Sequence, residues 1–169
     1  LLGLTGGIAC YKAAELLRLL TKAGAQVQVM MSEAACHFIT PVTMQALSGQ
    51  AVVTDQWDAR PATNMAHIHL GRDADLIVIA PASADFIAKL AQGRSDEIVS
   101  LTCLARPAGT PLLLAPAMNR EMWAHPAPQR NLAQAVAAGA RSSGAGGGEQ
   151  ACGEYGDGRL LVAAEIYAD

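Results

Sequence analysis

The residue of this chain that is hardest to explain by packing alone is a cysteine. Cys152 lies inside a glycine-rich stretch, 142–159, in the order Gln150-Ala151-Cys152-Gly153-Glu154. A free cysteine usually behaves as a small buried apolar side chain, but a segment so rich in glycine buries little. Because a thiol can act as a nucleophile or a proton donor, Cys152 is a candidate for chemistry. The other cysteines stand in apolar, helix-like surroundings and are expected to be structural: Cys10, Cys36 and Cys103.

Two further segments carry side chains suited to proton transfer or to hydrogen bonding. Segment 65–71 contains His67 and His69, and segment 116–123 contains Asn119 among methionines and a tryptophan. A histidine titrates near neutral pH and therefore suits acid–base chemistry. Taken singly, each histidine is more readily interpreted as a hydrogen-bonded residue of the surface.

The start of the chain has the pattern of a phosphate-binding turn. An apolar run at 1–5 is followed by Gly6 and Gly7 and then by apolar residues at helical spacing. At such a strand-to-helix turn, unpaired backbone N–H groups and the helix dipole favour a phosphate, and glycine lets the phosphate approach the backbone. The alternative is a tight turn that binds nothing.

The same region argues against a dinucleotide. The turn is not a G-x-G-x-x-G fingerprint, and the second strand ends in Met31-Ser32 rather than in an acidic residue that could hold a ribose hydroxyl. A mononucleotide such as FMN is therefore the favoured cofactor. Ser32 and Ser83 follow two strand ends and would place hydroxyls on the same rim, although each alone is more readily a helix N-cap.

The elements that must position these residues alternate between strand and helix. Apolar runs predict strands at 1–5, 27–31, 75–80 and 111–115, and helical spacing predicts helices up to Gly24, from Ser32, from Pro41 to Gly49, and at 83–92, 96–105 and 125–138. The unalternating run at 75–80 is typical of a parallel strand covered on both faces. The sequence predicts an α/β fold: a three-layer α/β/α doubly wound parallel sheet, Rossmann-like, with its ligand site beyond the carboxyl ends of the strands.

Two regions interrupt this alternation. Segment 51–66 carries loop residues and is predicted to be a surface excursion. Segment 142–159 is predicted to be too rich in glycine for a regular element and to form a mobile flap. Because no repeat or second domain is evident, we predict one domain over 1–169.

Composition narrows the range of partners. The net charge is −3 and the 12 lysines and arginines are scattered, which argues against nucleic acid. The apolar runs are far shorter than the roughly 20 residues that span a bilayer, and no secretory signal opens the chain. The four cysteines form no C-x-x-C pair, so we expect no metal site, no disulfide framework, and a cytoplasmic protein that acts on a small molecule.

Four segments together resemble the homo-oligomeric flavin-containing cysteine decarboxylases. Pro81-Ala82-Ser83-Ala84-Asp85 is similar to the P-A-S-A-N motif, and 116–123 matches P-x-M-N-x-x-M-W. Segment 65–71 resembles the one that bears the family's active-site histidine, with His67 at that position. Segment 150–159 resembles A-C-G-[DE]-x-G-x-G-R of the phosphopantothenoylcysteine decarboxylase branch, and the likeness extends from Leu1 to Arg159.

The resemblance implies roles for individual residues. Asn119 would bind the substrate carboxylate, His67 would assist oxidation and decarboxylation, and Cys152 would protonate an enethiol intermediate. The residues implied to bind FMN are Thr5, Gly6, Gly7, Ile8, Ser32, Ser83, Ala84 and Asp85. Those implied to contact the substrate besides Asn119 are Met118, Met122, Trp123, Ala151 and Gly153.

The resemblance also implies a reaction and an assembly. The reaction is decarboxylation of 4'-phosphopantothenoylcysteine to 4'-phosphopantetheine in coenzyme A biosynthesis, with the flavin first oxidising the substrate and later returning the electrons. A related branch that acts on peptidyl cysteines stops at the enethiol and lacks the cysteine, so Cys152 favours the pantothenate branch. Members form homotrimers, or dodecamers built of trimers, with FMN between subunits. Many also carry a C-terminal phosphopantothenate–cysteine ligase domain, which would begin just after Asp169.

Three alternatives are compatible with parts of the sequence. One is an FMN-binding prenyltransferase of the same architecture, which segments 116–123 and 151–154 argue against. Another is a non-catalytic flavin-binding regulatory subunit, as among relatives that inhibit phosphatases, which typically carry long acidic extensions. The last is a plain nucleotide-binding module whose glycines and serines are structural.

Overall fold

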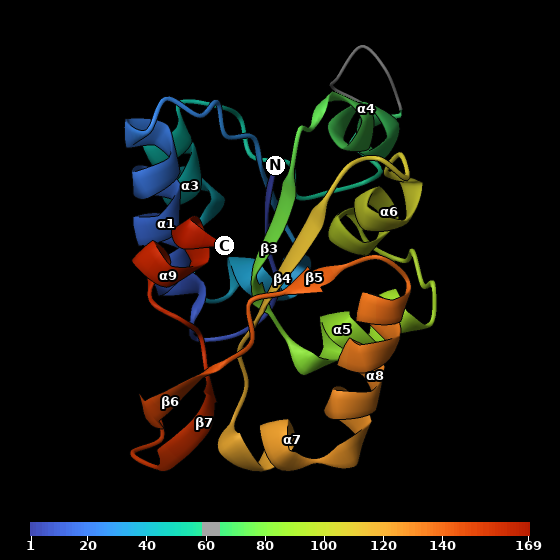
Figure 1. Cartoon of the computed structure of the whole chain (residues 1–169). Helices are drawn as coiled ribbons and strands as arrows, with labels where there is room; N and C mark the ends of the chain where they lie inside the picture. Colours follow the sequence, from blue (N-terminus) through green and yellow to red (C-terminus); the bar gives the residue numbers. More distant parts are fainter. Residues whose placement is uncertain (59–64) are drawn as a thin grey trace.

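A sheet of five parallel strands forms the centre of the structure, a computed structural model that describes residues 1–58 and 65–169 (Figure 1). Every neighbouring pair of its strands is parallel. In spatial order the strands are β2 (Val29–Met31), β1 (Leu2–Leu4), β3 (Ile77–Ala82), β4 (Leu112–Pro116) and β5 (Arg141–Ser142). After β1 the chain adds β2 on one side and the later strands on the other, so the strand order reverses between β1 and β3.

Helices cover both faces of this sheet (Figure 1). One face is covered by α1 (Cys10–Lys22), α3 (Pro41–Ser48) and α9 (Ala163–Ala168), and the other by α4 (Ala66–Asp73), α5 (Ala84–Ala91), α6 (Ile98–Ala105) and α8 (Pro126–Ala137). Two shorter helices, α2 (Glu33–Cys36) and α7 (Arg120–Ala124), follow strand ends. This is the predicted three-layer doubly wound fold. Among the described residues, no helix is long and apolar enough to cross a membrane.

The strand sequences read as continuous apolar runs because both faces are buried. Val78 and Ala80 pack with α1, α3 and α9, whereas Ile77 and Ile79 pack with α5, α6 and α8. Since successive strand side chains point to opposite faces, each face receives its own apolar set. The prediction of a strand covered on both faces is confirmed, although β3 continues through Pro81 to Ala82 rather than ending at the proline.

Several helix ends lie where the sequence predicted them. Ser32 caps α2 by accepting a hydrogen bond from the Ala35 N–H at 3.2 Å. Thr40 caps α3 in the same way, with Pro41 as the first helical residue. Gly49 ends α3 with φ of 70°, a left-handed conformation that favours glycine.

The predicted surface excursion at 51–66 contains more structure than expected. Val53 pairs with β2, since its N–H donates to Val29 O at 3.0 Å and its carbonyl accepts from Met31 N–H at 2.9 Å. The excursion also reaches the start of α4, a helix that the sequence reasoning missed. Residues 59–64 of this prediction lie outside the described residues.

The prediction that segment 142–159 holds no regular element is wrong. Strands β6 (Gly146–Glu149) and β7 (Tyr155–Arg159) pair as an antiparallel hairpin, which lies beside α7 and below β4 in Figure 1. Glycine weakens an isolated strand, but here it permits close docking. A Cβ on Gly158 would lie 2.6 Å from Met118 O, and the backbone N–H of Met118 donates to Gly158 O at 2.8 Å.

We predict that Gly3→Ala destabilises the fold by about 1–3 kcal/mol, the usual cost of overpacking a core. A Cβ at Gly3 would lie 2.6 Å from Ile79 Cδ1 and 3.1 Å from both Met30 Cε and Val99 Cγ1. Chemical denaturation of the variant measures the loss of unfolding free energy. Gly109→Ala is the control, because no described atom lies within 4 Å of its Cβ position. Equal stability of the two variants would contradict this account of the core.

Candidate active site

A buried threonine joins the two strands between which the strand order reverses. The Thr5 hydroxyl donates to Pro81 O at 2.6 Å and accepts from the Ser83 N–H at 2.8 Å. The Thr5 N–H also donates to Pro81 O, at 3.3 Å. Thr5 therefore fixes the carboxyl ends of β1 and β3 side by side. The sequence predicted Thr5 as a cofactor-binding residue, and both partners of its hydroxyl are groups of this chain.

The turn between β1 and α1 presents free backbone donors. Within residues 1–58 and 65–169, the N–H groups of Gly6, Gly7, Ile8 and Ala9 have no hydrogen-bond partner. A Cβ on Gly6 would lie 2.5 Å from the Ala34 Cβ, whereas the space beside Gly7 is open to 4 Å among the described atoms. Since these N–H groups precede the N-terminus of a 13-residue helix, they form a cradle that fits a phosphate group.

The other predicted cofactor residues lie on the same rim, but their side chains have local partners. The Ser32 hydroxyl caps α2, and the Ser83 hydroxyl caps α5 by accepting from the Phe86 N–H at 3.2 Å. Asp85 is exposed and pairs with Lys89 at 3.4 Å. The donors left for an anion at this edge are therefore backbone N–H groups, among them those of the turn after Thr5.

A second cluster joins α7 to the hairpin. The Asn119 side chain caps α7 by accepting from the Glu121 N–H at 2.8 Å, and its Nδ2 donates to Glu154 Oε2 at 2.8 Å. The Cys152 thiol also donates to Glu154 Oε2, at 3.5 Å, and lies 3.9 Å from Asn119 Nδ2. The sequence predicted Asn119 and Cys152 for the same site. The fold brings these two side chains together, although they are 33 positions apart in the sequence.

Gln150 holds the hairpin turn against this cluster. Its Oε1 accepts from the Arg120 N–H at 3.0 Å, and its Nε2 donates to Met118 O at 3.2 Å and to Asp157 O at 3.1 Å. The sequence reasoning assigned no role to Gln150, Arg120 or Glu154. Each is a polar residue inside a segment that carries a predicted site residue, which is the signal that could have identified them.

The remaining predicted substrate residues surround this cluster. Ala151 and Gly153 are exposed in the hairpin turn, and Gly153 has φ of 83°. Met122 is exposed, whereas Trp123 is partly buried. The backbone N–H of Trp123 donates to Asn119 O at 2.9 Å. The Cys152 thiol, between Ala151 and Gly153 in the turn, is open to solvent.

The electrostatics of the cluster favour a charged Glu154. The hydrogen bond from Asn119, then that from Cys152, and then the charge of Arg120 3.9 Å away hold the pKa of the Glu154 carboxyl below its usual value of 4.5. The carboxylate is therefore ionised at neutral pH. By contrast, burial raises the pKa of Cys10 to about 11 and that of Cys103 to about 12, so these thiols stay protonated.

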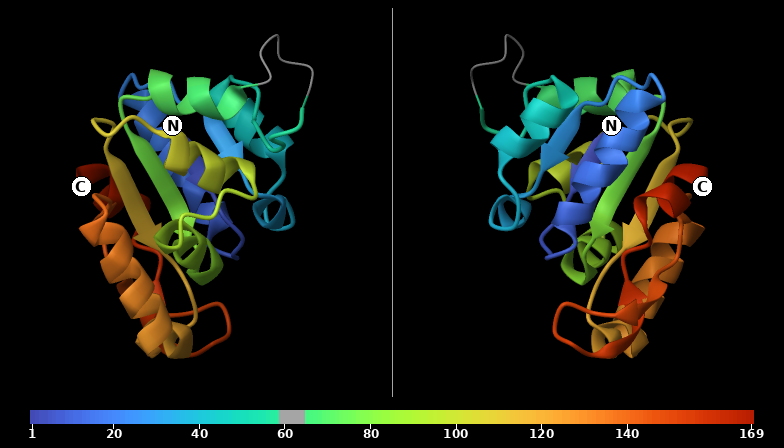
Figure 2. Two further views of the ribbon diagram at one scale, coloured as in Figure 1. Left: turned by 90° about the vertical axis from the view of Figure 1, so that its right-hand side faces the viewer. Right: turned by 90° about the vertical axis from the view of Figure 1, so that its left-hand side faces the viewer.

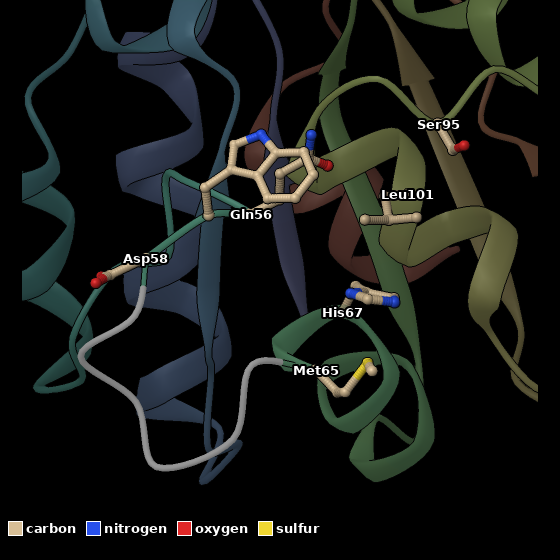
Figure 3. Close-up of a pocket in the computed structure, with 7 residues that line it drawn as sticks. Gln56, Asp58, Met65, His67, Ser95 and Leu101 are labelled. Atoms are coloured by element: carbon tan, nitrogen blue, oxygen red, sulfur yellow. The ribbon is translucent and has the colours of Figure 1, made fainter.

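His67 lies elsewhere in the chain. It is the second residue of α4 and lines a cavity of about 500 Å³ (Figure 3). Other lining residues are Trp57 from the loop before α4, Ser95 from the loop between α5 and α6, and Leu101 from α6. Helix α4 leads into the amino end of β3, whereas α7 and the hairpin lie at the carboxyl ends, on the opposite side of the molecule in every view (Figures 1 and 2). One chain therefore does not unite His67 with Asn119 and Cys152. His69, on the same helix, is exposed.

The fold and the cradle define a class of protein. A doubly wound sheet of order 2-1-3-4-5 binds its ligand at the reversal of strand order, where flavodoxin-like proteins hold FMN. The free N–H groups lie at that point. A scan against protein-family models matches residues 1–167 to the Flavoprotein family, and the chain belongs to this family.

Individual proteins of known sequence or structure are similar to this chain over most of its length. The chain is 47% identical over 165 residues to the coenzyme A biosynthesis bifunctional protein CoaBC of Haemophilus influenzae, covering 98% of this chain but 41% of that protein. It therefore spans about two-fifths of the length of such relatives. Among solved structures, a PPC decarboxylase mutant complexed with pantothenoylaminoethenethiol has a TM-score of 0.88 at 29% identity, covering 99% of this chain and 92% of that one. The FMN-dependent cysteine decarboxylase SpaF has a TM-score of 0.81 at 30% identity, covering 99% and 94%.

We predict that iodoacetamide labels Cys152 at least 100-fold faster than Cys10 or Cys103 in the native protein at pH 8. Cys152 is exposed, and a thiol with a pKa of about 11 is ionised in only about one molecule per thousand at that pH. Peptide mass spectrometry over time measures the rate at each site. Unfolded protein, in which all four cysteines should react alike, is the control, and rapid native labelling of Cys10 would contradict the structure.

Proposed function

We propose that this chain is an FMN-dependent decarboxylase that converts 4'-phosphopantothenoylcysteine to 4'-phosphopantetheine in coenzyme A biosynthesis. The observation that carries this proposal is the cluster of Asn119, Cys152 and Glu154 at the same edge of the sheet as the phosphate cradle. The likeness to CoaBC and to a PPC decarboxylase supports the choice of substrate. The bifunctional relatives are longer, and we propose only the decarboxylase activity for this chain. We place it in the cytoplasm, where an exposed thiol such as Cys152 stays reduced.

In this proposal the backbone holds the phosphate of FMN. The N–H groups of Gly6, Gly7 and Ile8 would donate to it, and Ser32, Ser83, Ala84 and Asp85 would form the adjacent rim. Bound flavin would supply a reversible two-electron oxidation of the substrate, which provides the electron sink that loss of CO2 requires. The chain itself offers no such sink, so its residues would bind, orient and protonate.

Asn119 suits a substrate carboxylate because its amide can donate hydrogen bonds without adding a charge. A cation at this position would stabilise the carboxylate in the ground state and so oppose the loss of CO2. The Asn119 side chain is held by its own bond to the Glu121 N–H at 2.8 Å, which leaves Nδ2 facing the hairpin. Asn119 is therefore a fixed neutral donor.

Cys152 suits the final proton transfer. Its thiol is exposed in the hairpin turn and already donates to a carboxylate oxygen, Glu154 Oε2. Asn119 Nδ2 and Cys152 Sγ are 3.9 Å apart. A substrate whose carboxylate is bound by Asn119 would therefore have the carbon that loses CO2 close to the thiol. Cys152 is the proton donor that completes the reduction of the enethiol in this scheme.

We further propose that His67 acts in the site of a neighbouring copy, within a homotrimer or a dodecamer built of trimers. The support is geometric, because α4, which carries His67, leads into the amino end of β3, whereas α7 and the hairpin lie at the carboxyl ends of the strands. Large apolar side chains are exposed near both places: Trp57 at 81% beside the His67 cavity, and Ile8 at 57% and Tyr11 at 58% beside the cradle. Such side chains suit contacts between copies.

The test of the activity is anaerobic incubation of the FMN-loaded protein with 4'-phosphopantothenoylcysteine, followed by mass spectrometry. We expect CO2 and 4'-phosphopantetheine from the wild type, and from Cys152→Ser a product two hydrogens lighter with at least a 100-fold loss of 4'-phosphopantetheine. Cys36→Ser is the matched control and should retain full activity, because Cys36 packs against the core and makes none of the hydrogen bonds of the cluster. Bound FMN without release of CO2 would refute the proposal and favour a prenyltransferase or a regulatory flavin-binding subunit.

A site shared between copies predicts complementation. His67→Asn and Cys152→Ser proteins should each fail to make 4'-phosphopantetheine, whereas mixed oligomers from co-expression of differently tagged variants should recover activity. If each site takes His67 from one copy and Cys152 from another, random assembly leaves about a quarter of the sites intact. Absence of any recovered activity in purified mixed oligomers would show that a site does not combine residues of two copies.

A further inference from the structure

The amide that the proposed function assigns to the substrate carboxylate is already bound to a carboxylate of the chain. Asn119 Nδ2 donates to Glu154 Oε2 at 2.8 Å, and its other neighbour is Cys152 Sγ at 3.9 Å. Asn119 Oδ1 accepts from the Glu121 N–H. The side chain thus makes its strongest donor contact with Glu154, in the direction of the hairpin that carries Cys152.

The Glu154 carboxylate makes the contacts that a bound carboxylate ligand would make at this place. One oxygen, Oε2, accepts from both Asn119 and Cys152 and lies 3.9 Å from Arg120 Nε. These three groups make the carboxylate the favoured form. Its side chain is 41% exposed, so it can leave for solvent without crossing the core.

The hairpin does not depend on Glu154 for its position. Gln150 ties the turn to Met118 and Arg120, and Met118 N–H donates to Gly158 O at 2.8 Å. The Arg120 guanidinium also donates to Tyr155 O at 3.2 Å. Loss of the Glu154 contact therefore frees Asn119 while the hairpin stays docked.

We infer that Glu154 is an internal competitor for the substrate carboxylate, a role that rests on the proposed function. Asn119 Nδ2 has two hydrogens, but a second carboxylate bound beside Glu154 Oε2 would bring two like charges to contact distance, which is unfavourable. A substrate carboxylate must therefore displace Glu154 Oε2 from Asn119. Once CO2 has left, the product has no carboxylate to compete with, and Glu154 returns to Asn119. Glu154 thus weakens binding of the substrate, which carries a carboxylate, but does not weaken binding of the decarboxylated product.

The distinguishing measurement is a comparison of substrate and product affinity. The FMN-loaded His67→Asn protein serves as the background, since it should bind the substrate without turning it over. Calorimetry then gives Kd for 4'-phosphopantothenoylcysteine and for 4'-phosphopantetheine, with and without Glu154→Gln. Glu154→Gln keeps an oxygen acceptor but removes the charge, so we expect it to tighten substrate binding by about threefold to tenfold, the usual difference between a charge-assisted and a neutral hydrogen bond. Product binding should stay within about twofold.

A purely structural Glu154 predicts a different result, in which both affinities weaken together because the hairpin loosens. That result, or unchanged affinity for both compounds, overturns the inference. Glu149→Gln is the matched control, a neutralised exposed glutamate of β6 in the same hairpin, and it should alter neither affinity. Failure of the background protein to bind either compound would instead refute the proposed function itself, so the two failures are distinct.

Discussion

The hydroxyl of Thr5 is the contact on which the arrangement of the candidate site depends. It is 2% exposed and bridges Pro81 O and the Ser83 N–H, where the strand order reverses. A buried polar group costs more when its hydrogen bonds are missing than it contributes when they are made. The bridge therefore holds the end of β1 beside the start of α5, and the free N–H groups after β1 open at that edge.

The site divides its work between backbone and side chains. The hydroxyls of Ser32 and Ser83 cap helices, so an anion at the cradle would meet backbone N–H groups. The side chains that we propose to act on the substrate, Asn119 and Cys152, lie at the N-terminal cap of α7 and in the hairpin that docks against it. His67 lies at the other end of the sheet, which is the geometry expected if each chain supplies parts of two sites in an oligomer.

The hairpin shows why composition alone misjudged segment 142–159. Glycine costs entropy in a strand and contributes no side-chain packing, so a local rule predicts a mobile flap. In the structure the absence of a side chain at Gly158 allows the hairpin to dock closely. A Cβ on Gly158 would lie 2.6 Å from Met118 O and 3.0 Å from Trp123 Cβ. The stabilisation comes from contacts with residues more than thirty positions earlier, such as the hydrogen bond from Gln150 Nε2 to Met118 O, which no local pattern contains.

Local sequence patterns are enough to predict the layered α/β fold, most helix and strand positions, the caps at Ser32 and Thr40, and the candidate site residues. Those features follow from local periodicity, capping chemistry and residue type, which neighbouring residues carry. Four features became visible only in the folded chain: α4 forms at 66–73, the hairpin docks on α7, Asn119 donates to Glu154, and His67 lies apart from that cluster. These depend on contacts between residues distant in sequence, whose geometry is set by how the sheet, its covering helices and the hairpin pack together.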